Sequence, residues 1–259
     1  MLRNSPAPWP NPEPDRRLAL QHQLLPFIEQ DSLRRRWNES DPQFNLNQRD
    51  ENGVLWGPGF VFMRQVVKTF QCPSNPIPSP LNVAADPASS GRYFINHYFG
   101  NAGNRSHPRG PTVGRPNLYD FQDGMFTQNS RFKFSDVTDG TSNTLLYGER
   151  HYFDPVFDTQ TGDRIYTWGW CWFGATGDAM LGSGVPINYK LPLNFSTLSG
   201  GTQQLLYEDR LNAFGSAHTG GANFAMTDGS VRFIRDSITP LTFRAVGTRA
   251  SGEVFTSDF

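Results

Sequence analysis

The chain has 259 residues, enough to bury a sizeable core as one large domain or two small ones. Its 23 basic and 24 acidic residues give a net charge of −1, which excludes the strongly basic surface that binds nucleic acid or anionic membrane. No run of about 18 apolar residues occurs, so we expect no membrane span in this sequence. Only 18% of the residues are charged while 14% are aromatic, and 25 glycines and 20 prolines favour a loop-rich, β-dominated fold.

The first elements follow a proline-rich start. Residues 1–16 contain five prolines and are predicted to form a mobile leader. From residue 17 to 37 the apolar residues recur with helical spacing, and Pro26 is expected to divide this segment into two short helices. We interpret the remainder, residues 17–259, as a single domain.

The middle of the chain alternates loops with short strands. Residues 92–100 have the composition of a strand, and the Asp139-Gly140 turn is followed by a second strand over 144–148. Residues 174–210 are predicted to be mostly loop. A short helix with Pro240 near its start is expected close to the C-terminus. The predicted class is therefore α+β, with short N-terminal helices packed on an antiparallel, loop-rich sheet.

The stretch Phe214–Ile234 predicts a β-hairpin. If Asp228-Gly229 is a two-residue type I′ turn, Met226 pairs with Val231 and Phe224 with Phe233. One face of the hairpin is then apolar and should enter the core, while the other is polar. The residues expected on the core face are Phe224, Met226, Val231 and Phe233, and those on the polar face are Asn223, Ala225, Thr227, Ser230 and Arg232.

The same hairpin bears on His218 and Asp228, which at first suggest a catalytic or metal-binding pair. A strand of six residues between them spans roughly 20 Å, so a straight hairpin holds them at opposite ends. We therefore expect Asp228-Gly229 to set the turn. His218, beside the Gly220-Gly221 bend, should bond loop carbonyls or pair with a carboxylate such as Glu149.

Metal binding finds little support in the residue spacing. Cys72 and Cys171 belong to no C-x-x-C pair, so zinc is not expected, although the two can form one disulfide if the protein is exported. Asp136, Asp139 and Asn143 are a weak candidate set for calcium. They do not form an EF-hand, and an Asx-turn before a strand explains them equally.

Aromatic residues supply a second candidate site. Trp168, Trp170 and Trp172 share one face of a predicted strand, where they either pack in the core or form a carbohydrate-binding platform. The sequence contains no G-x-S-x-G elbow, P-loop or dinucleotide fingerprint. No catalytic residues are assigned and no cofactor is expected.

Five segments, taken in order, resemble one known family. They are "LLPFIEQDSL", "FQCPSNP", "NHYFGNAG", "DVTDGTSNTLLYGER" and the element in which nine residues separate His218 from Asp228-Gly229. Together they resemble the DUF1559 family of pilin-like proteins from planctomycete bacteria, with its H-X9-DG element. His97 is inserted in the middle of the third pattern.

The resemblance implies an exported protein with a prepilin-type leader, an N-terminal membrane helix and a β-rich, pilin-like head. This chain departs from that plan at its start, where neither a prepilin-type leader nor a membrane helix is visible. The leading hypothesis is a non-enzymatic, extracytoplasmic structural or interaction domain whose partners are other pilin-like subunits or cell-surface components. The alternatives are a carbohydrate or surface-ligand binding module that uses the tryptophans, and a metal-dependent hydrolase built on His218, Glu149 and Asp136 or Asp139.

Overall fold

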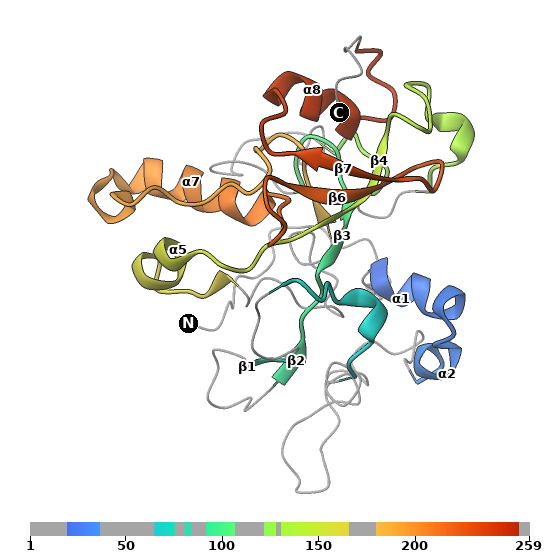
Figure 1. Cartoon of the computed structure of the whole chain (residues 1–259), viewed down its shortest axis with the longest axis horizontal. Helices are drawn as coiled ribbons and strands as arrows, with labels where there is room; N and C mark the ends of the chain where they lie inside the picture. The colour runs from blue at the N-terminus through green and yellow to red at the C-terminus, as the bar shows by residue number, and fades with distance from the viewer. Residues whose placement is uncertain are drawn as a thin grey trace, which may run out of the picture.

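The computed structural model describes residues 20–36, 65–75, 81–83, 92–106, 122–127, 131–165 and 180–253. In these residues a five-stranded sheet is accompanied by short helices, which confirms the predicted α+β class (Figure 1). The predicted leader over residues 1–16 lies outside the described residues.

The central sheet has the strand order β5-β3-β4-β6-β7. Every neighbouring pair is antiparallel except β3 and β5, which are parallel, so the sheet is mixed rather than purely antiparallel. Its strands are β3 (Tyr98–Asn101), β4 (Leu145–Glu149), β5 (Met180–Leu181), β6 (Gly221–Met226) and β7 (Val231–Arg235). A separate two-stranded sheet contains β1 (Leu81–Val83) and β2 (Arg92–Phe94).

Short helices precede the sheet in the chain, and Pro26 divides them as predicted. They are α1 (Leu20–Leu24), the 3₁₀ helix η1 (Leu25–Ile28) and α2 (Asp31–Arg34). Proline is accepted in the first turn of η1 because that position needs no backbone donor. The Gln21 side chain donates to the Tyr98 carbonyl, which joins α1 to β3.

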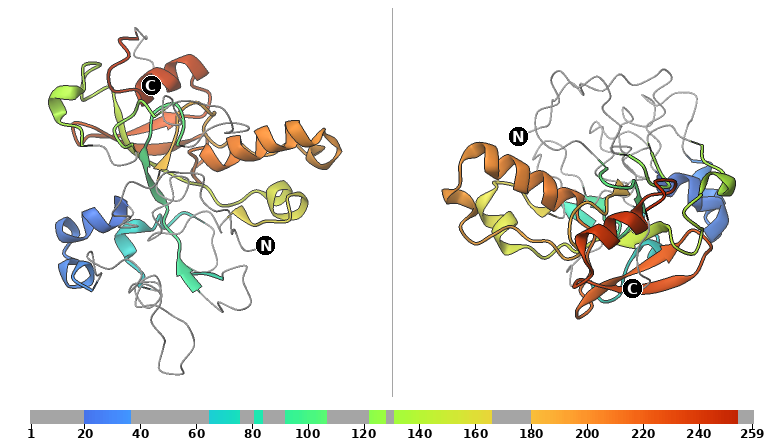
Figure 2. Two further views of the ribbon diagram at one scale, coloured as in Figure 1. Left: turned by 180° about the vertical axis from the view of Figure 1, so that it is seen from behind. Right: turned by 90° about the horizontal axis from the view of Figure 1, so that it is seen from above.

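Two helices on one side of the sheet were not predicted. They are α5 (Pro155–Gln160) and α7 (Gly200–Asn212), and α7 contradicts the predicted loop over 174–210. Its sequence begins with two glycines and carries no apolar stripe, so its pattern resembles a loop. Tertiary contacts stabilise it: Tyr207 stacks on Phe157 of α5 at 5.0 Å between ring centroids, and Ser199 caps its start. Figure 2 shows the two helices projecting together.

The other helices in the described ranges are η2 (Lys68–Phe70), η3 (Phe134–Asp136), η5 (Phe195–Thr197) and α8 (Pro240–Gly247). The last of these confirms the C-terminal helix expected around Pro240. No helix in the described ranges combines the length and apolar character needed to cross a bilayer.

The core lies where α8 packs against the sheet. Phe214, Phe224 and Phe243 contact one another edge to face, with centroids 5.3–6.4 Å apart. Gly148 of β4 lies beneath them, and a Cβ there would approach ring atoms of Phe214 and Phe224 at 2.6 Å. Glycine at this position therefore lets the aromatic rings pack directly onto the strand backbone.

The hairpin of β6 and β7 forms in a register one residue away from the predicted one. Ala225 pairs with Val231 and Phe224 with Arg232, so the loop has three residues, Thr227-Asp228-Gly229, instead of two. The amide of Gly229 donates to the Met226 carbonyl, and Gly229 has φ +88°, which fits a type I turn followed by a left-handed residue. Thr227 is the additional loop residue, and its amide and hydroxyl both donate to the Thr144 carbonyl, which stabilises this longer loop.

This register reverses half of the predicted core face, because a shift of one residue turns every side chain of a strand to the opposite face. Phe224 and Met226 are buried as predicted, but Val231 and Phe233 are 69% and 44% exposed. Ile234 occupies the core in their place. The prediction that Val231 and Phe233 fill the core is therefore wrong.

Candidate functional site

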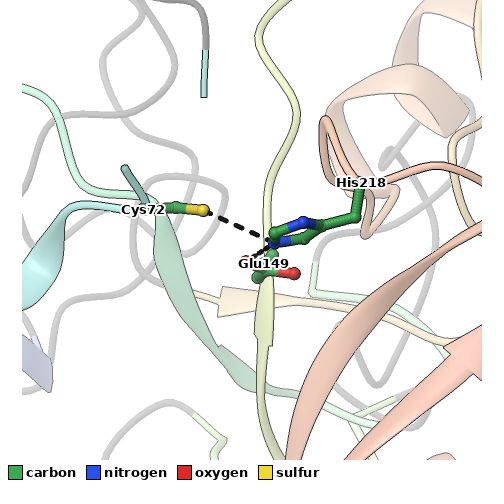
Figure 3. Close-up of side chains that lie close together, drawn as sticks. All are labelled: Cys72, Glu149 and His218. Atoms are coloured by element: carbon green, nitrogen blue, oxygen red, sulfur yellow. Dashed lines mark hydrogen bonds and ion pairs between the residues drawn. The ribbon is translucent and has the colours of Figure 1, made fainter. Parts of the chain in front are cut away.

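Three chemically active side chains from distant segments converge at the end of β4. They are Cys72, Glu149 and His218, and one ligand atom from each lies within 4.8 Å of the other two. Figure 3 shows the Cys72 sulfur and the Glu149 carboxylate directed at the same edge of the His218 ring. Among the described residues this is the one cluster of three or more cysteine, histidine or acidic side chains with such spacing.

Cys72 is held by a turn that follows η2. The Cys72 amide donates to Nδ1 of His97 at 2.8 Å, and the Asn75 amide closes the turn by donating to the Cys72 carbonyl. The Asn75 side chain also donates to the Arg150 carbonyl. These bonds fix the cysteine turn between the residue before β3 and the residue after β4.

Glu149 is the last residue of β4 and pairs with Tyr98 across the ladder. Its Oε2 accepts from the amide of Asn223 at 2.7 Å and from the Asn223 side chain at 3.3 Å. The side chain is only 3% exposed. Because Oε2 is engaged by Asn223, Oε1 remains the oxygen that faces His218 Nε2, at 3.4 Å.

His218 lies in the loop before β6. Its amide donates to the Ser216 hydroxyl, which in turn donates to the Gly221 carbonyl. Gly220 has φ +79°, a conformation that glycine adopts without strain, and this residue turns the chain into β6. The His218 side chain is 31% exposed, so the cluster can be reached from solvent.

Burial controls the protonation of the surrounding groups. It raises the pKa of the Cys72 thiol, and the nearby Glu149 carboxylate adds to this rise. Burial, together with the neighbouring Cys72 and Glu149, raises the pKa of Tyr98 to about 12. Burial lowers the pKa of His97 to about 4, so this ring is neutral at pH 7 and accepts the Cys72 amide. Without a bound cation, Cys72 is therefore a protonated thiol and a poor nucleophile.

The geometry differs from that of a cysteine catalytic triad. In a triad the nucleophile contacts one histidine nitrogen and the orienting carboxylate contacts the other. Here Cys72 Sγ lies 3.8 Å and Glu149 Oε1 lies 3.4 Å from the same atom, His218 Nε2. The arrangement therefore directs three donor atoms at one point and does not relay a proton along a line.

The structure places the other candidate residues elsewhere. His218 precedes β6 and Asp228 follows it, and Asp228 accepts from the Ser230 amide in the hairpin loop. Asp139 accepts from the amides of Ser251 and Gly252. The Asp228 amide donates to Thr141, so the Asp139-Gly140 turn adjoins the hairpin tip, at the end of β4 away from Glu149.

The residues proposed for calcium lie in local turns. Asp136 accepts from the Lys133 amide, and the Asn143 amide donates to the Gly140 carbonyl, where Gly140 has φ +95°. These bonds form turns around the residues proposed for calcium. No described cluster of ligand atoms includes Asp136 or Asp139.

Several predicted residues lie outside the described part of the chain. They are Trp168, Trp170, Trp172 and Cys171. Cys72 itself carries a free, buried thiol. Sequence reasoning considered a contact between His218 and Glu149 but did not connect Cys72 to either. The available signal was that each of the three belongs to one of the five family-like segments.

The fold and the cluster define a loop-rich α+β domain in which residues from three of the five family-like segments meet around one strand end. The sequence matches the family described as "Protein of unknown function (DUF1559)" over residues 4–241. The match covers most of the 259 residues, so the chain belongs to this family. No curated protein and no solved structure was found to match it.

Proposed function

We propose that this protein is a non-enzymatic, extracytoplasmic, pilin-like domain with a structural or interaction role. The observation that carries the proposal is how the carboxylates of the family-like segments are used. Asp139 accepts from the backbone at 251 and 252, Asp228 from Ser230, and Glu149 from Asn223. Asp139 and Glu149 thereby join distant backbone segments and Asp228 closes its own hairpin loop, which is the use expected of residues that maintain an architecture.

The hydrolase alternative receives less support. It needs Asp136 or Asp139 beside His218 and Glu149, and these aspartates bond to backbone near the opposite end of β4. The carbohydrate alternative depends on Trp168, Trp170 and Trp172, which lie outside the described residues. The contact between His218 and Glu149 is present, but no contact brings Asp136 or Asp139 to it among the described residues, so neither alternative is carried forward.

The surface proposed for interaction is the outer edge of β7. This strand ends the sheet and pairs only with β6 among the described strands, and its Val231 and Phe233 side chains are exposed. An exposed strand edge with apolar side chains is a template for pairing with another strand. The partner we propose is a second pilin-like subunit.

The location is tested by fractionating cells that produce the protein from its native gene. We expect the protein in the cell envelope or the medium, and we expect protease added to intact cells to degrade it while a cytoplasmic enzyme stays protected. A protein confined to the cytoplasm contradicts the proposal.

The interaction surface is tested separately by crosslinking and light scattering across a concentration series. We expect Phe233→Lys to lower self-association because it places a charge on the proposed strand-pairing edge. Leu241→Lys is the matched control, since Leu241 is also exposed but lies on α8. Equal association of both variants and the wild type contradicts a role for β7.

A further inference from the structure

We infer that Cys72, Glu149 and His218 form a binding site for a single divalent transition-metal ion, with Zn²⁺ as the cation that this ligand set favours. This inference goes beyond the structural role proposed above and does not depend on it. It rests on the chemistry of the three side chains, on the distances between their donor atoms and on the bonds that hold each one.

The distances favour a shared ion over a direct hydrogen bond. Tetrahedral Zn²⁺ binds sulfur at about 2.3 Å and nitrogen or oxygen at about 2.0 Å, which places sulfur and nitrogen ligands about 3.5 Å apart and nitrogen and oxygen ligands about 3.3 Å apart. Here Sγ of Cys72 lies 3.8 Å from Nε2 of His218, and Oε1 of Glu149 lies 3.4 Å from it. A direct charge-assisted bond between His218 and Glu149 would be about 2.8 Å long.

The three ligands are also held in advance by other bonds. The Cys72 amide is bound to His97, the second oxygen of Glu149 to Asn223, and the His218 amide to Ser216. Each bond uses an atom other than the proposed ligand atom, so Sγ, Oε1 and Nε2 remain directed at one point (Figure 3). Outer contacts of this kind orient ligands in metal sites and raise their affinity.

The ligand types select the metal. Thiolate and imidazole together suit zinc and its neighbours in the first transition row, whereas calcium and magnesium prefer oxygen ligands alone. Three protein ligands leave a fourth position for water or for a group from another molecule. The 31% exposure of His218 gives an ion a route from solvent to the buried Cys72 and Glu149.

This site could not be recognised from the sequence, because its ligands do not form a local motif. The three residues lie in segments far apart in the sequence, and they meet because β4 ends beside both the cysteine turn and the loop before β6. The absence of a C-x-x-C pair excludes only sites whose ligands are close in sequence. The expectation that no zinc site is present therefore does not extend to this arrangement.

The test is titration of the full, reduced, metal-free chain with Co²⁺, followed by competition with Zn²⁺. We expect one equivalent of Co²⁺ to bind with a near-ultraviolet thiolate-to-cobalt charge-transfer band, and Zn²⁺ to abolish that band. Cys72→Ser should remove the band. His218→Ala and Glu149→Gln should weaken binding by more than the 10- to 100-fold typical of losing an outer partner.

Two matched variants act as controls. Cys171→Ser removes the other cysteine, and Asp228→Asn alters a carboxylate of the same hairpin at the far end of β6. Both variants should bind one equivalent of Co²⁺ with the same affinity and the same charge-transfer band as the wild type. Far-ultraviolet circular dichroism confirms folding, and the partly exposed His218→Ala variant keeps the test valid if Cys72→Ser does not fold.

Three results overturn the inference. The first is failure of the reduced wild-type chain to bind Co²⁺ or Zn²⁺, and the second is an unchanged charge-transfer band in Cys72→Ser. The third is a Cys72–Cys171 disulfide in protein isolated from its native cells, because a disulfide removes the thiolate ligand. The first two results do not bear on the cellular location or on β7, and the disulfide would remove the metal site while agreeing with an exported protein. This inference and the proposed function can therefore fail independently.

Discussion

Arg210 and Asp154 form an ion pair inside the protein, with Arg210 Nε 2.8 Å from Asp154 Oδ2 and both side chains at most 2% exposed. Asp154 also accepts from the amides of Phe157 and Leu191, and Arg210 donates to the His151 carbonyl. The pair therefore joins the start of α5 to the last turn of α7. Burial lowers the pKa of Arg210, and Asp154 opposes that effect most strongly among the neighbouring groups.

Replacing Arg210 tests this pair. Arg210→Met keeps much of the side-chain volume but leaves the Asp154 carboxylate buried without its cation, which should lower the free energy of unfolding by about 3–5 kcal/mol. Urea denaturation measures the change. Arg35→Met is the control, because its pair with Asp31 is exposed and should contribute at most about 1 kcal/mol. Similar losses in the two variants would show that the buried pair has no special role.

The raised pKa of Asp123 predicts that the stability of the fold depends on pH. Its Oδ1 accepts from the Asn104 amide at 2.7 Å, and burial raises its pKa above the ordinary 3.8. The folded chain therefore holds this proton at pH values where the unfolded chain has released it. The stability from this group is present below the unfolded pKa and is lost as the pH rises through the folded pKa.

Asp123→Asn keeps an oxygen that can accept from Asn104 but cannot ionise. We expect the variant to gain stability relative to the wild type between about pH 3.5 and pH 7, because only the wild type loses the contribution of the bound proton. Urea unfolding midpoints at both pH values measure this difference. A constant difference, or one that shrinks as the pH rises, contradicts the pKa assigned to Asp123.

At the scale of the elements, the position of the β6–β7 turn could be predicted from the sequence, but the length of its loop could not. The Asp-Gly signal correctly locates a turn, because only a few residues tolerate the backbone angles required there. It does not determine the loop length, which depends on the bonds from Thr227 to Thr144, a residue distant in the sequence. One additional loop residue reverses the inward face of β7 and exposes Val231 and Phe233.

Helix α7 illustrates the same limit. Its amino acids form no apolar stripe, so periodicity alone indicates a loop. Ser199 caps its start locally, but its contact between Tyr207 and Phe157 is made with α5, a partner that the local sequence does not encode. By contrast, Pro26 and Pro240 act through their own backbone geometry, and the breaks and starts that they predict are observed.

Glycines in three elements provide a graded test of this fold. Gly229→Ala should cost about 1 kcal/mol, because the residue has φ +88° but no atom lies within 4 Å of the added methyl group. Gly148→Ala should cost about 1–3 kcal/mol or more, because the methyl group would overlap Phe214 and Phe224. Thermal and urea unfolding measure both changes.

Gly201→Ala is the matched control for these two variants. The residue lies in the first turn of α7, has open space around its Cα and needs no left-handed conformation. We expect the substitution to be neutral or slightly stabilising, since alanine has the higher helix propensity. A loss at Gly229 no larger than at Gly201 would contradict the three-residue loop.

For the whole molecule, β4 is the strand that joins the central sheet, the aromatic core and the Cys72–Glu149–His218 cluster. It pairs with β3 and β6, carries Gly148 beneath the aromatic core and ends at Glu149 in the cluster. The Asn101 side chain also donates to the carbonyls of Leu145 and Gly247, which joins β3, β4 and α8. No periodic pattern in a sequence encodes such contacts, so the candidate site could be assembled only in three dimensions.

This arrangement predicts the order in which backbone amides exchange with solvent. Amides of β4 and of the strands on either side of it, β3 and β6, should exchange only on global unfolding, because their hydrogen bonds lie in the interior of the sheet. The amides of β7 that point away from β6 should exchange much faster, since β7 has one neighbouring strand among those described. Hydrogen–deuterium exchange followed by mass spectrometry or NMR measures both rates.

The concentration dependence of exchange extends this prediction to assembly. If β7 pairs with a second subunit, raising the protein concentration should slow exchange along its outer edge and leave β4 unchanged, because only the edge amides gain a new acceptor. Phe233→Lys should remove the concentration dependence without altering protection in β4. Protection of β7 equal to that of β4 in dilute protein would instead mean that its edge is already covered within a single chain, and a second subunit could not pair there.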